Sequence, residues 1–533
     1  MNQPAAEVVD AVVIGAGHNG LVAANLLADA GWDVHVLEAT DEPGGAVRSG
    51  ETTAPGFRTD HCSAFYPLTA ASPVIASLRL DRHGLRWRHA PAVLAHVLPD
   101  DRCVMIHRDI ERTAESVAAF APQDGDAWIE EFRLWQHIRD DVLQAILSPF
   151  PPVRPAARLL RRVGAGGALR LGRRAVLPAR RLGYEVFAGE GAQLLLAGNA
   201  MHTDLGPDQG GSGVFGWLLA MLAQDVGFPA AEGGAGCITD ALVHRLRAAG
   251  GRLSCRRRVD KVLVAGGRAL GVRDEHGELV RARRAVLADV PAPTLYLGLV
   301  GADELPAKLL DDLRRFEWDD ATIKVDWALS RQIPWTASEA GAAGTVHLGA
   351  DLNGLAGVSN DLACARVPRN PFLLLGQMTT ADPTRSPAES ESVWAYTHVP
   401  REPRWTPDRL RRFADRMERV IEANAPGFRH RIMARSVTGP IELEEQNPSL
   451  VGGAVNAGTA GIHQQLFFRP VPGLARADTP IDRLYLAGAT AHPGGAVHGG
   501  PGANAARAVL RRDGWLGSGY RAAVDTAFRA IYR

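Results

Sequence analysis

Cysteine is scarce in this sequence, and its five copies are scattered along 533 residues. None of them belongs to a C-x-x-C pair, which a redox-active dithiol requires, and their spacing matches neither a zinc site nor a secreted disulfide framework. The sequence therefore predicts reduced thiols and no metal centre. The five residues are Cys62, Cys103, Cys237, Cys255 and Cys364.

Net charge is also absent, because 59 basic residues balance 59 acidic ones. A chain without a global field does not recruit nucleic acid by charge. The sequence lacks a run of about eighteen uninterrupted apolar residues, and its first residues, MNQPAAEVVDAVVIG, show no basic segment followed by an apolar one. We therefore expect a cytoplasmic protein that does not span a membrane.

Glycine, in contrast, is abundant, and one glycine-rich turn has an informative context. In VVIGAGHNGLVAANLLADAGWDVHVLEATDEPGGAVR, Val12 to Arg48, a G-x-G-x-x-G turn separates two periodic segments. Val8 to Ile14 predicts a buried parallel strand, and Leu21 to Ala30 predicts a helix. A strand, a tight turn and a helix in this order are typical of a site that binds the pyrophosphate of a dinucleotide. The three glycines are Gly15, Gly17 and Gly20.

A carboxylate follows the next predicted strand, Asp33 to Leu37, at Glu38. A carboxylate there accepts hydrogen bonds from both ribose hydroxyls of adenosine and repels a 2′-phosphate, so NADP is disfavoured and FAD or NAD remains. Another glycine run, Gly164 to Gly167, follows no predicted strand and lies among arginines. The sequence therefore predicts one bound dinucleotide rather than two.

The other end of the chain contains a second strand-to-helix turn, in DRLYLAGATAHPGGAVHGGPGANAAR. A predicted strand, Leu484 to Ala487, runs into the glycines, and a helix follows from about Gly502. Between the two ends, a helix over Ile238 to Ala249 precedes short alternating strands. Glycine-rich turns at opposite ends of the chain indicate that both ends close around one long cofactor.

At these residues the sequence resembles the phytoene desaturase-like flavoproteins, within the larger group that includes the monoamine and polyamine oxidases. The resemblance covers nearly the whole chain: GAGHNGLVAANLLADAGWDVHVLEATDEPGGAV is similar to the N-terminal FAD motif of the family. LFFRPVPG and TPIDRLYLAGATAHPGGAVHGGPGANAAR are similar to its C-terminal flavin motif. The nearest subgroups are the carotenoid ketolases and animal proteins described as pyridine nucleotide-disulfide oxidoreductase domain proteins. The resemblance implies FAD as the cofactor.

The resemblance also implies roles for single positions. Glu38 holds the adenosine ribose, the backbone of Val259 contacts adenine, and Gly44-Gly45 pass beneath the ribityl chain. The C-terminal turn contacts phosphate and ribityl oxygens and starts a helix that points at the flavin C2 carbonyl. Where the family often has a basic residue after the paired glycines, this chain has Ala46, with Arg48 two positions on. The expected FAD-binding set is Gly15, Ala16, Gly17, His18, Asn19, Gly20, Glu38, Ala39, Gly44, Gly45, Ala46, Arg48, Val259, Gly488, Ala489, His492, Gly495, Val497, His498 and Gly499.

The expected fold is α/β, with a Rossmann-type FAD-binding domain assembled from discontinuous segments and an inserted α+β substrate domain. The FAD-binding domain is expected to comprise residues 1–75, 229–300 and 436–533. A substrate- or membrane-facing insertion is expected over residues 76–228, and a substrate domain of mixed sheet and helices over residues 301–435.

Four residues are candidate catalytic groups, and Lys324, one of only three lysines, is the most distinctive. It stands in DDATIKVDWALS, where apolar and polar residues alternate, so one strand face is apolar and the other presents the lysine. Arginine cannot give up a proton near neutral pH, whereas a partly buried lysine can. The stretch resembles the amine oxidase strand whose lysine holds a water at flavin N5; the alternative is an ion pair with Asp326.

The other three candidates are His61, Tyr66 and His498. His61 and Tyr66 lie in GFRTDHCSAFYPL, where members of the family pass the substrate across the flavin. For the histidines near the ring, which include His18 and His492, packing or a bond to the backbone is the alternative role. Desaturation by hydride loss needs few acid or base groups.

An arginine-rich segment, Arg154 to Arg181, contains no acidic residue. Its interleaved leucines and valines are typical of a basic amphipathic stretch that lies on an anionic bilayer. The alternative is a solvated, partly mobile surface excursion, because prolines and glycines interrupt the segment. Nucleic-acid binding is disfavoured, since aromatic residues on which bases stack are missing from it.

These observations and the resemblance predict an FAD-dependent oxidoreductase that removes a hydride from a lipophilic, isoprenoid or carotenoid-like substrate. Oxygen or a quinone then reoxidises the flavin. Two alternatives stay open: an amine oxidase-type flavoenzyme on the same fold, and an FAD-loaded interaction protein with little turnover. The sequence predicts no oligomeric state.

Overall fold

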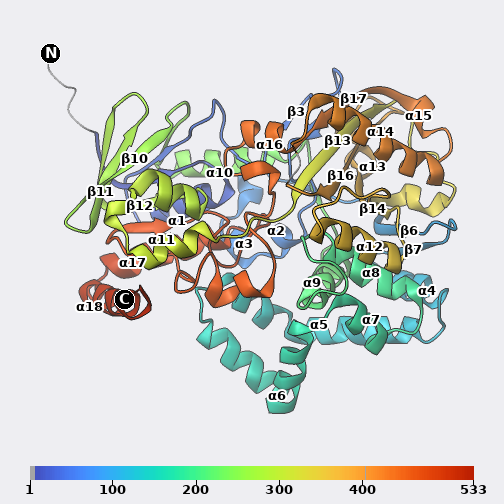
Figure 1. Ribbon diagram of the computed structural model, residues 1–533, viewed down its shortest axis with the longest axis horizontal. Coiled ribbons are helices and arrows are strands. Elements are labelled where there is room, and N and C mark those ends of the chain that lie inside the picture. Colours follow the sequence, from blue (N-terminus) through green and yellow to red (C-terminus); the bar gives the residue numbers. More distant parts are fainter. Residues whose placement is uncertain (1–6, 402–403, 533) are drawn as a thin grey trace.

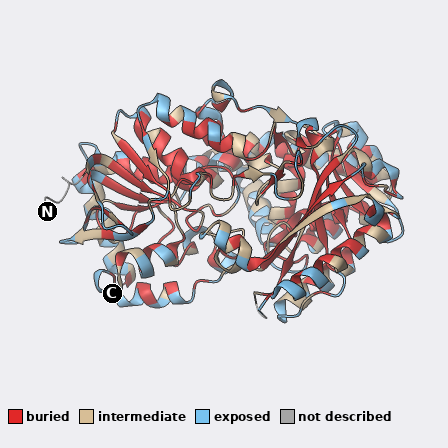
Figure 2. Cartoon of the chain, turned by 90° about the horizontal axis from the view of Figure 1, so that it is seen from above, coloured by how far each residue is buried: buried red, intermediate tan, exposed pale blue. Residues whose placement is uncertain are grey.

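The computed structural model describes residues 7–401 and 404–532, and its two large sheets form the centres of two lobes (Figure 1). Buried residues are concentrated in the strands of both sheets, whereas the outer sides of the surrounding helices are exposed (Figure 2). A group of helices forms a third region beside the second sheet (Figure 1).

The first sheet has the order β10-β11-β12-β1-β2-β9, with β18 paired to β12. β1 is parallel to both of its neighbours, β12 and β2. The side chains of β1 enter an apolar core on each face of the sheet, Ala11 and Val13 on one face and Val12 and Ile14 on the other, which explains its nearly continuous apolar sequence. The bounds are β1 Glu7–Ile14, β2 Val34–Leu37, β9 Arg252–Ser254, β10 Val259–Ala265, β11 Arg268–Asp274, β12 Leu279–Ala288 and β18 Leu484–Leu486.

Helices from distant parts of the chain cover this sheet. α1 (His18–Asp29) contacts α10 (Gly236–Ala248) and α17 (Gly500–Asp513). The N-terminal, middle and C-terminal segments therefore share one core, which confirms the predicted α/β fold built from discontinuous segments. Two further helices, α11 (Ala307–Arg314) and α18 (Gly517–Tyr532), contact each other in this lobe.

The second sheet has the order β17-β13-β16-β15-β14-β6-β7 and is mostly antiparallel. β13 carries the predicted alternation: Ile323, Val325, Trp327 and Leu329 enter an apolar core with α14 (Pro407–Asn424), and Thr322 and Lys324 border a cavity on the other face. The bounds are β6 Ala92–Val97, β7 Cys103–Ile106, β13 Ala321–Leu329, β14 Ala343–Leu348, β15 Leu373–Gln377, β16 Glu391–Val399 and β17 Ile432–Thr438.

Helices α8 and α9 pack beside the second sheet, on the face opposite α14. α6 contains most of the arginine-rich segment and is helical except at Gly164, where φ is +69°. The Gly164 to Gly167 run therefore lies inside a helix and follows no strand. The bounds are α4 Ile110–Ala118, α5 Asp124–Leu147, α6 Val153–Val176, α7 Ala179–Val186, α8 Glu190–Ala200, α9 Ser212–Asp225 and α12 Leu352–Ala363.

Short elements connect the lobes. β3 pairs with β4, and β5 pairs with β8. Their bounds are β3 Ser49–Gly50, β4 Thr59–Asp60, β5 Trp87–Arg88 and β8 Ala230–Ala231. The short helices are α2 Pro67–Ala71, α3 Pro73–Ser77, α13 Met378–Ala381, α15 Phe428–Arg431 and α16 Pro440–Gln446.

Candidate cofactor and substrate site

The turn between β1 and α1 has no room for side chains at its three glycines. A Cβ on Gly15 would lie 2.7 Å from the carbonyl oxygen of Asp289, and one on Gly20 would lie 2.3 Å from the carbonyl oxygen of Gly15. Gly17 is the N-cap of α1 and has no side chain to cap the helix, and among the described residues only the Gly20 N–H of the first turn is taken up by a side chain, so the N–H groups before it are available to an anion. The turn therefore fits a pyrophosphate.

Glu38 lies where β2 ends and borders the cavity. One carboxylate oxygen accepts a hydrogen bond from the Ala16 N–H at 2.7 Å, and the other accepts bonds from the N–H and hydroxyl of Thr40 at 2.9 Å. These bonds fix a negative charge beside the pyrophosphate turn, in the place where an adenosine ribose is expected. The arrangement suits a ribose with free hydroxyls and opposes a 2′-phosphate.

Asp289 is a site residue that sequence reasoning missed. It directly follows β12, the parallel neighbour of β1, and its Oδ2 accepts a hydrogen bond from the Gly20 N–H at 2.7 Å. Burial raises the pKa of Asp289 to about 7. The signal that Glu38 provided, an acid at the carboxyl end of a parallel strand, was also present at Asp289.

We expect FAD affinity to fall as the pH rises through about 7, because ionised Asp289 repels the pyrophosphate. Bound phosphates would raise the pKa of this carboxyl further, so FAD binding takes up a proton above pH 7 and weakens by up to about tenfold per pH unit there. Titration of the apoprotein with FAD at several values between about pH 6 and pH 8 measures the slope of the logarithm of FAD affinity against pH. Asp289→Asn should remove it, and a slope that persists in this variant would contradict the assignment.

The second glycine pair, Gly44 and Gly45, packs against the first turn. Gly44 has φ of +122° and bridges to Gly17, and Gly45 borders the cavity. Arg48 is buried, and it donates to the carbonyl oxygens of Gly45 at 3.2 Å and Gln446 at 2.5 Å. Arg48 therefore joins this turn to the C-terminal end of α16 at the edge of the cavity.

The C-terminal turn follows β18. A Cβ on Gly488 would lie 2.5 Å from the Val290 carbonyl oxygen, so this turn packs tightly on the chain after β12. α17 begins at Gly500, two residues before the predicted start at about Gly502. Nε2 of His498 lies 3.0 Å from the Gly495 carbonyl oxygen, and its Nδ1 accepts from the Gly500 N–H at 3.1 Å. Both ring nitrogens bond to the backbone, so His498 holds the loop.

One continuous cavity of about 940 Å³ connects the two turns with the second sheet. Eighteen of the residues expected at the site border it: Gly15, Gly17, His18, Asn19, Glu38, Ala39, Gly45, Ala46, Arg48, Tyr66, Val259, Lys324, Gly488, Ala489, His492, Gly495, Val497 and His498. The glycine cradles, the acid at Glu38 and the cavity that continues to Lys324 together fit FAD.

Five expected residues do not border this cavity: Ala16, Gly20, Gly44, Gly499 and His61. The three glycines belong to the turns that border the cavity but do not line it themselves. The ring of His61 lies against β3, where a Cβ on Gly50 would lie 3.1 Å from Nε2 of His61. Direct contact of His61 with a substrate in the cavity is therefore not supported by this geometry. Tyr66 borders the cavity, but its hydroxyl donates to the Ser63 carbonyl oxygen at 2.8 Å.

Lys324 is buried and pairs with both carboxylate oxygens of Asp326. The ion pair named as the alternative role is therefore present, and the lysine also borders the cavity. Burial raises the pKa of Asp326, and the charge of Lys324 opposes this shift. The placement of Lys324 beside flavin N5 stays a prediction.

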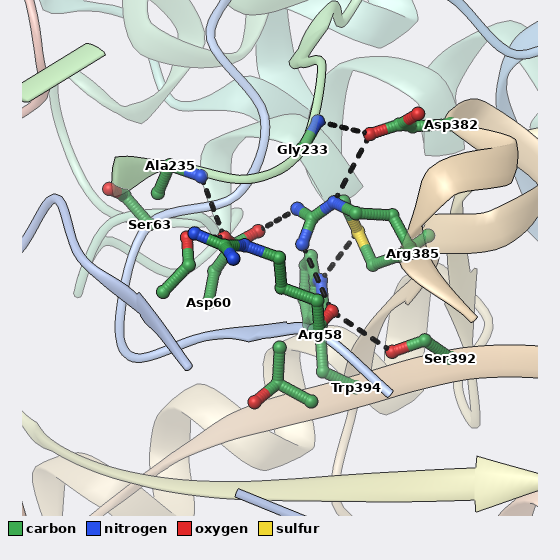
Figure 3. Close-up of polar contacts among 12 residues, drawn as sticks. Arg58, Asp60, Ser63, Gly233, Ala235, Asp382, Arg385, Ser392 and Trp394 are labelled. Carbon is green, nitrogen blue, oxygen red and sulfur yellow. Dashed lines mark hydrogen bonds and ion pairs between the residues drawn. The ribbon is translucent and has the colours of Figure 1, made fainter. Parts of the chain in front are cut away.

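A buried ionic network is centred on Arg385 (Figure 3). Arg385 is fully buried, pairs with Asp60, and lies 3.4 Å from Asp382. Asp60 in turn accepts a hydrogen bond from the Ala235 N–H at 2.8 Å, and Asp382 accepts one from the Gly233 N–H at 2.8 Å. The network joins β4 and the segment before α10 to the second sheet, so it fixes how the two lobes meet.

Two aromatic residues of β16 were not predicted as site residues. Trp394 and Tyr396 both border the cavity, and their rings stack at 5.9 Å between centroids. Their alternation in ESVWAYTHV was a usable signal, since residues two apart share a strand face. Their position beside Lys324 depends on the register of β13 with β16, in which Lys324 stands opposite Tyr396.

The comparisons with known proteins agree with this geometry. Residues 13–78 match the family model described as an NAD(P)-binding Rossmann-like domain. The chain is 24% identical to a phytoene desaturase (neurosporene-forming) of Cereibacter sphaeroides, over 96% of both chains. It is 30% identical to the pyridine nucleotide-disulfide oxidoreductase domain-containing protein 2 of Rattus norvegicus, over 94% of this chain and 93% of the rat protein. The chain belongs to the phytoene desaturase-like family of FAD-dependent oxidoreductases.

A solved structure shares the fold of this desaturase-like oxidoreductase. Putrescine oxidase bound to putrescine superposes with a TM-score of 0.59 at 17% identity, over 94% of this chain and 98% of that one. At this identity the likeness shows the fold alone. The desaturase-like oxidoreductase therefore shares the fold of putrescine oxidase.

Among residues 7–401 and 404–532, no helix combines the length and the apolar character that crossing a bilayer requires.

Proposed function

We propose that the enzyme removes a hydride from a lipophilic, isoprenoid or carotenoid-like substrate. The observation that carries this proposal is the apolar lining that α5, α6 and α9 give to one part of the cavity. Such a lining binds an apolar chain by removing it from water. The Cereibacter sphaeroides relative, named for phytoene, supports the same substrate class. The lining includes Val142, Ile146, Leu159, Val176, Val214, Phe215, Leu218 and Leu219.

Bound FAD supplies the hydride acceptor. The two glycine turns and Glu38 hold it, and the apolar helices orient the substrate chain and exclude water from it. Lys324, which is paired with Asp326, borders the same cavity. A positioned lysine there can hold a water and move a proton.

Anaerobic mixing of the holoprotein with candidate substrates tests this function. We expect isoprenoid polyenes to bleach the visible flavin absorbance. We expect NADH and NADPH not to bleach it at a useful rate, because the chain has one dinucleotide site. Rapid bleaching by NADH would contradict the single-site account. Bleaching by putrescine and not by any isoprenoid would favour the amine oxidase alternative instead.

We also propose that α6 rests on an anionic membrane surface and delivers the substrate. Val153, Leu160, Leu169 and Val176 of α6 are 49–77% exposed, and Val176 also borders the cavity. Several arginines of the segment pair with acids outside it, such as Arg158 and Arg162 with Asp141, Arg173 with Glu185, and Arg174 with Glu131. Within the described residues no carboxylate pairs with Arg154, Arg161 or Arg170.

Sedimentation with phosphatidylserine vesicles tests the membrane proposal. The double substitution Leu160→Ser with Leu169→Ser should weaken partition by roughly 10²-fold or more, because two leucines buried in the membrane together contribute about 3–6 kcal/mol. Partition of the unaltered protein should also fall as salt rises. Leu516→Ser is the matched control, since this leucine is 61% exposed but lies away from α6, before α18. Equal partition of the double variant and the control would exclude α6 as the contact.

A further inference from the structure

A histidine pair, with His347 buried and His202 partly exposed, lies at the edge of the cavity, beside the sheet face that carries Lys324. Nε2 of His202 lies 2.9 Å from Nε2 of His347, and His202 borders the cavity. In the sheet register, His347 stands opposite Leu374, Leu374 opposite Tyr396, and Tyr396 opposite Lys324. Three strand spacings separate the pair from the lysine, a distance of about 14 Å.

The surrounding hydrogen bonds assign the tautomers of these rings. Nδ1 of His347 is buried and has no partner among the described residues. A buried N–H without an acceptor is rarer in proteins than an acceptor without a donor, so Nδ1 of His347 carries a lone pair. Its proton is therefore on Nε2 and is donated to His202. The proton of His202 is then on Nδ1.

Two polar groups at this end of the cavity are left without a protein partner. In the described part of the chain, no residue accepts a hydrogen bond from Nδ1 of His202. Thr345 lies two residues from His347 on β14, is 1% exposed, borders the cavity, and its hydroxyl has no partner there either. A pure hydrocarbon in the cavity would leave both groups unsatisfied, which is unfavourable for buried polar groups.

We propose that His202 and Thr345 bind a neutral oxygen of the substrate, a hydroxyl or a carbonyl, at about 14 Å from Lys324. The inference rests on the proposed function and narrows it: the substrate is a lipophile that carries an oxygen, not a pure hydrocarbon. A carboxylate does not suit this end, because burial lowers the pKa of His202 to about 3 and that of His347 well below its usual range. Both rings are therefore neutral and offer no charge to pair with one.

Binding measurements on the holoprotein test this inference without turnover. The probes are farnesol and its deoxy hydrocarbon, and the visible absorbance of the bound flavin reports binding. We expect the unaltered protein to bind farnesol about tenfold more tightly than the hydrocarbon. His202→Leu should lose this preference while keeping its affinity for the hydrocarbon. His202→Asn should retain part of the preference, because the amide still donates a hydrogen bond.

The matched control is His89→Leu, since His89 is half-buried and does not border the cavity. Equal affinity of the unaltered protein for alcohol and hydrocarbon would overturn the inference, whether or not the leucine variant folds. An unchanged preference in His202→Leu would overturn it as well. Absence of the preference in the unaltered protein argues only against the oxygen site, whereas failure of every probe to reduce the flavin argues only against hydride transfer, so the two failures are distinguishable.

Discussion

Gly17→Val is expected to abolish stable FAD binding. A Cβ at this position would lie 2.6 Å from Oδ2 of Asp289, and the rest of the valine would enter the space in front of the N-terminus of α1. Over-packing against Asp289 costs about 1–3 kcal/mol, and the valine side chain in addition occupies the place of the pyrophosphate, so the purified variant is expected to contain no FAD. The FAD content of the purified variant, measured by its absorbance, checks the prediction.

Two controls separate loss of the cofactor from loss of the fold. Gly172→Ala in α6 is the neutral control, because a Cβ there meets nothing within 4 Å. The double substitution Gly17→Val with Asp289→Ala removes the clash between these two side chains but leaves the pyrophosphate position blocked. We expect this variant to fold and still lack FAD. A double variant with full FAD content would show that the turn does not hold the pyrophosphate.

Lys324→Met is expected to keep FAD and slow flavin reoxidation by roughly 10²-fold, the scale of a positioned proton-transfer group. The lysine is buried, borders the cavity and is held in place by Asp326. Stopped-flow mixing of the reduced enzyme with oxygen measures the rate. A methionine variant that reoxidises at the unaltered rate would end this assignment and leave the FAD assignment untouched.

The ion pair complicates this substitution, because methionine leaves Asp326 buried without its cation. Burial already raises the pKa of Asp326, so the carboxyl is expected to take up a proton in the variant. The double substitution Lys324→Met with Asp326→Asn removes both charges. It should regain thermal stability lost by the single variant while its reoxidation stays slow. Recovery of the rate together with stability would show a structural role only.

The cofactor-binding part of the fold could be predicted because its signals are local. The glycine turn, the acid at Glu38 and the strand at each end of the chain are each readable in a few residues. Boundaries shifted by small amounts: α1 begins at His18, three residues before the predicted start, because Gly17 already serves as its N-cap. The same local rule applied to Asp289 would have found the second acid of the turn.

The substrate end could not be placed from sequence, because it depends on pairing between distant strands. The alternation in β13 showed that Lys324 faces away from the apolar core, yet its neighbours Tyr396 and His347 are fixed only by the register of β16, β15 and β14. His202 follows α8 in a stretch without a motif. The roles of His498 and His61 likewise depend on which backbone groups surround the rings, and no local pattern encodes that.

Identification of the cofactor released from the purified, denatured protein tests the central claim most directly. The account predicts a yellow protein that releases FAD, close to one molecule per chain, as shown by mass spectrometry. Release of NAD or NADP in place of FAD, or a colourless protein that binds no added FAD, would contradict it.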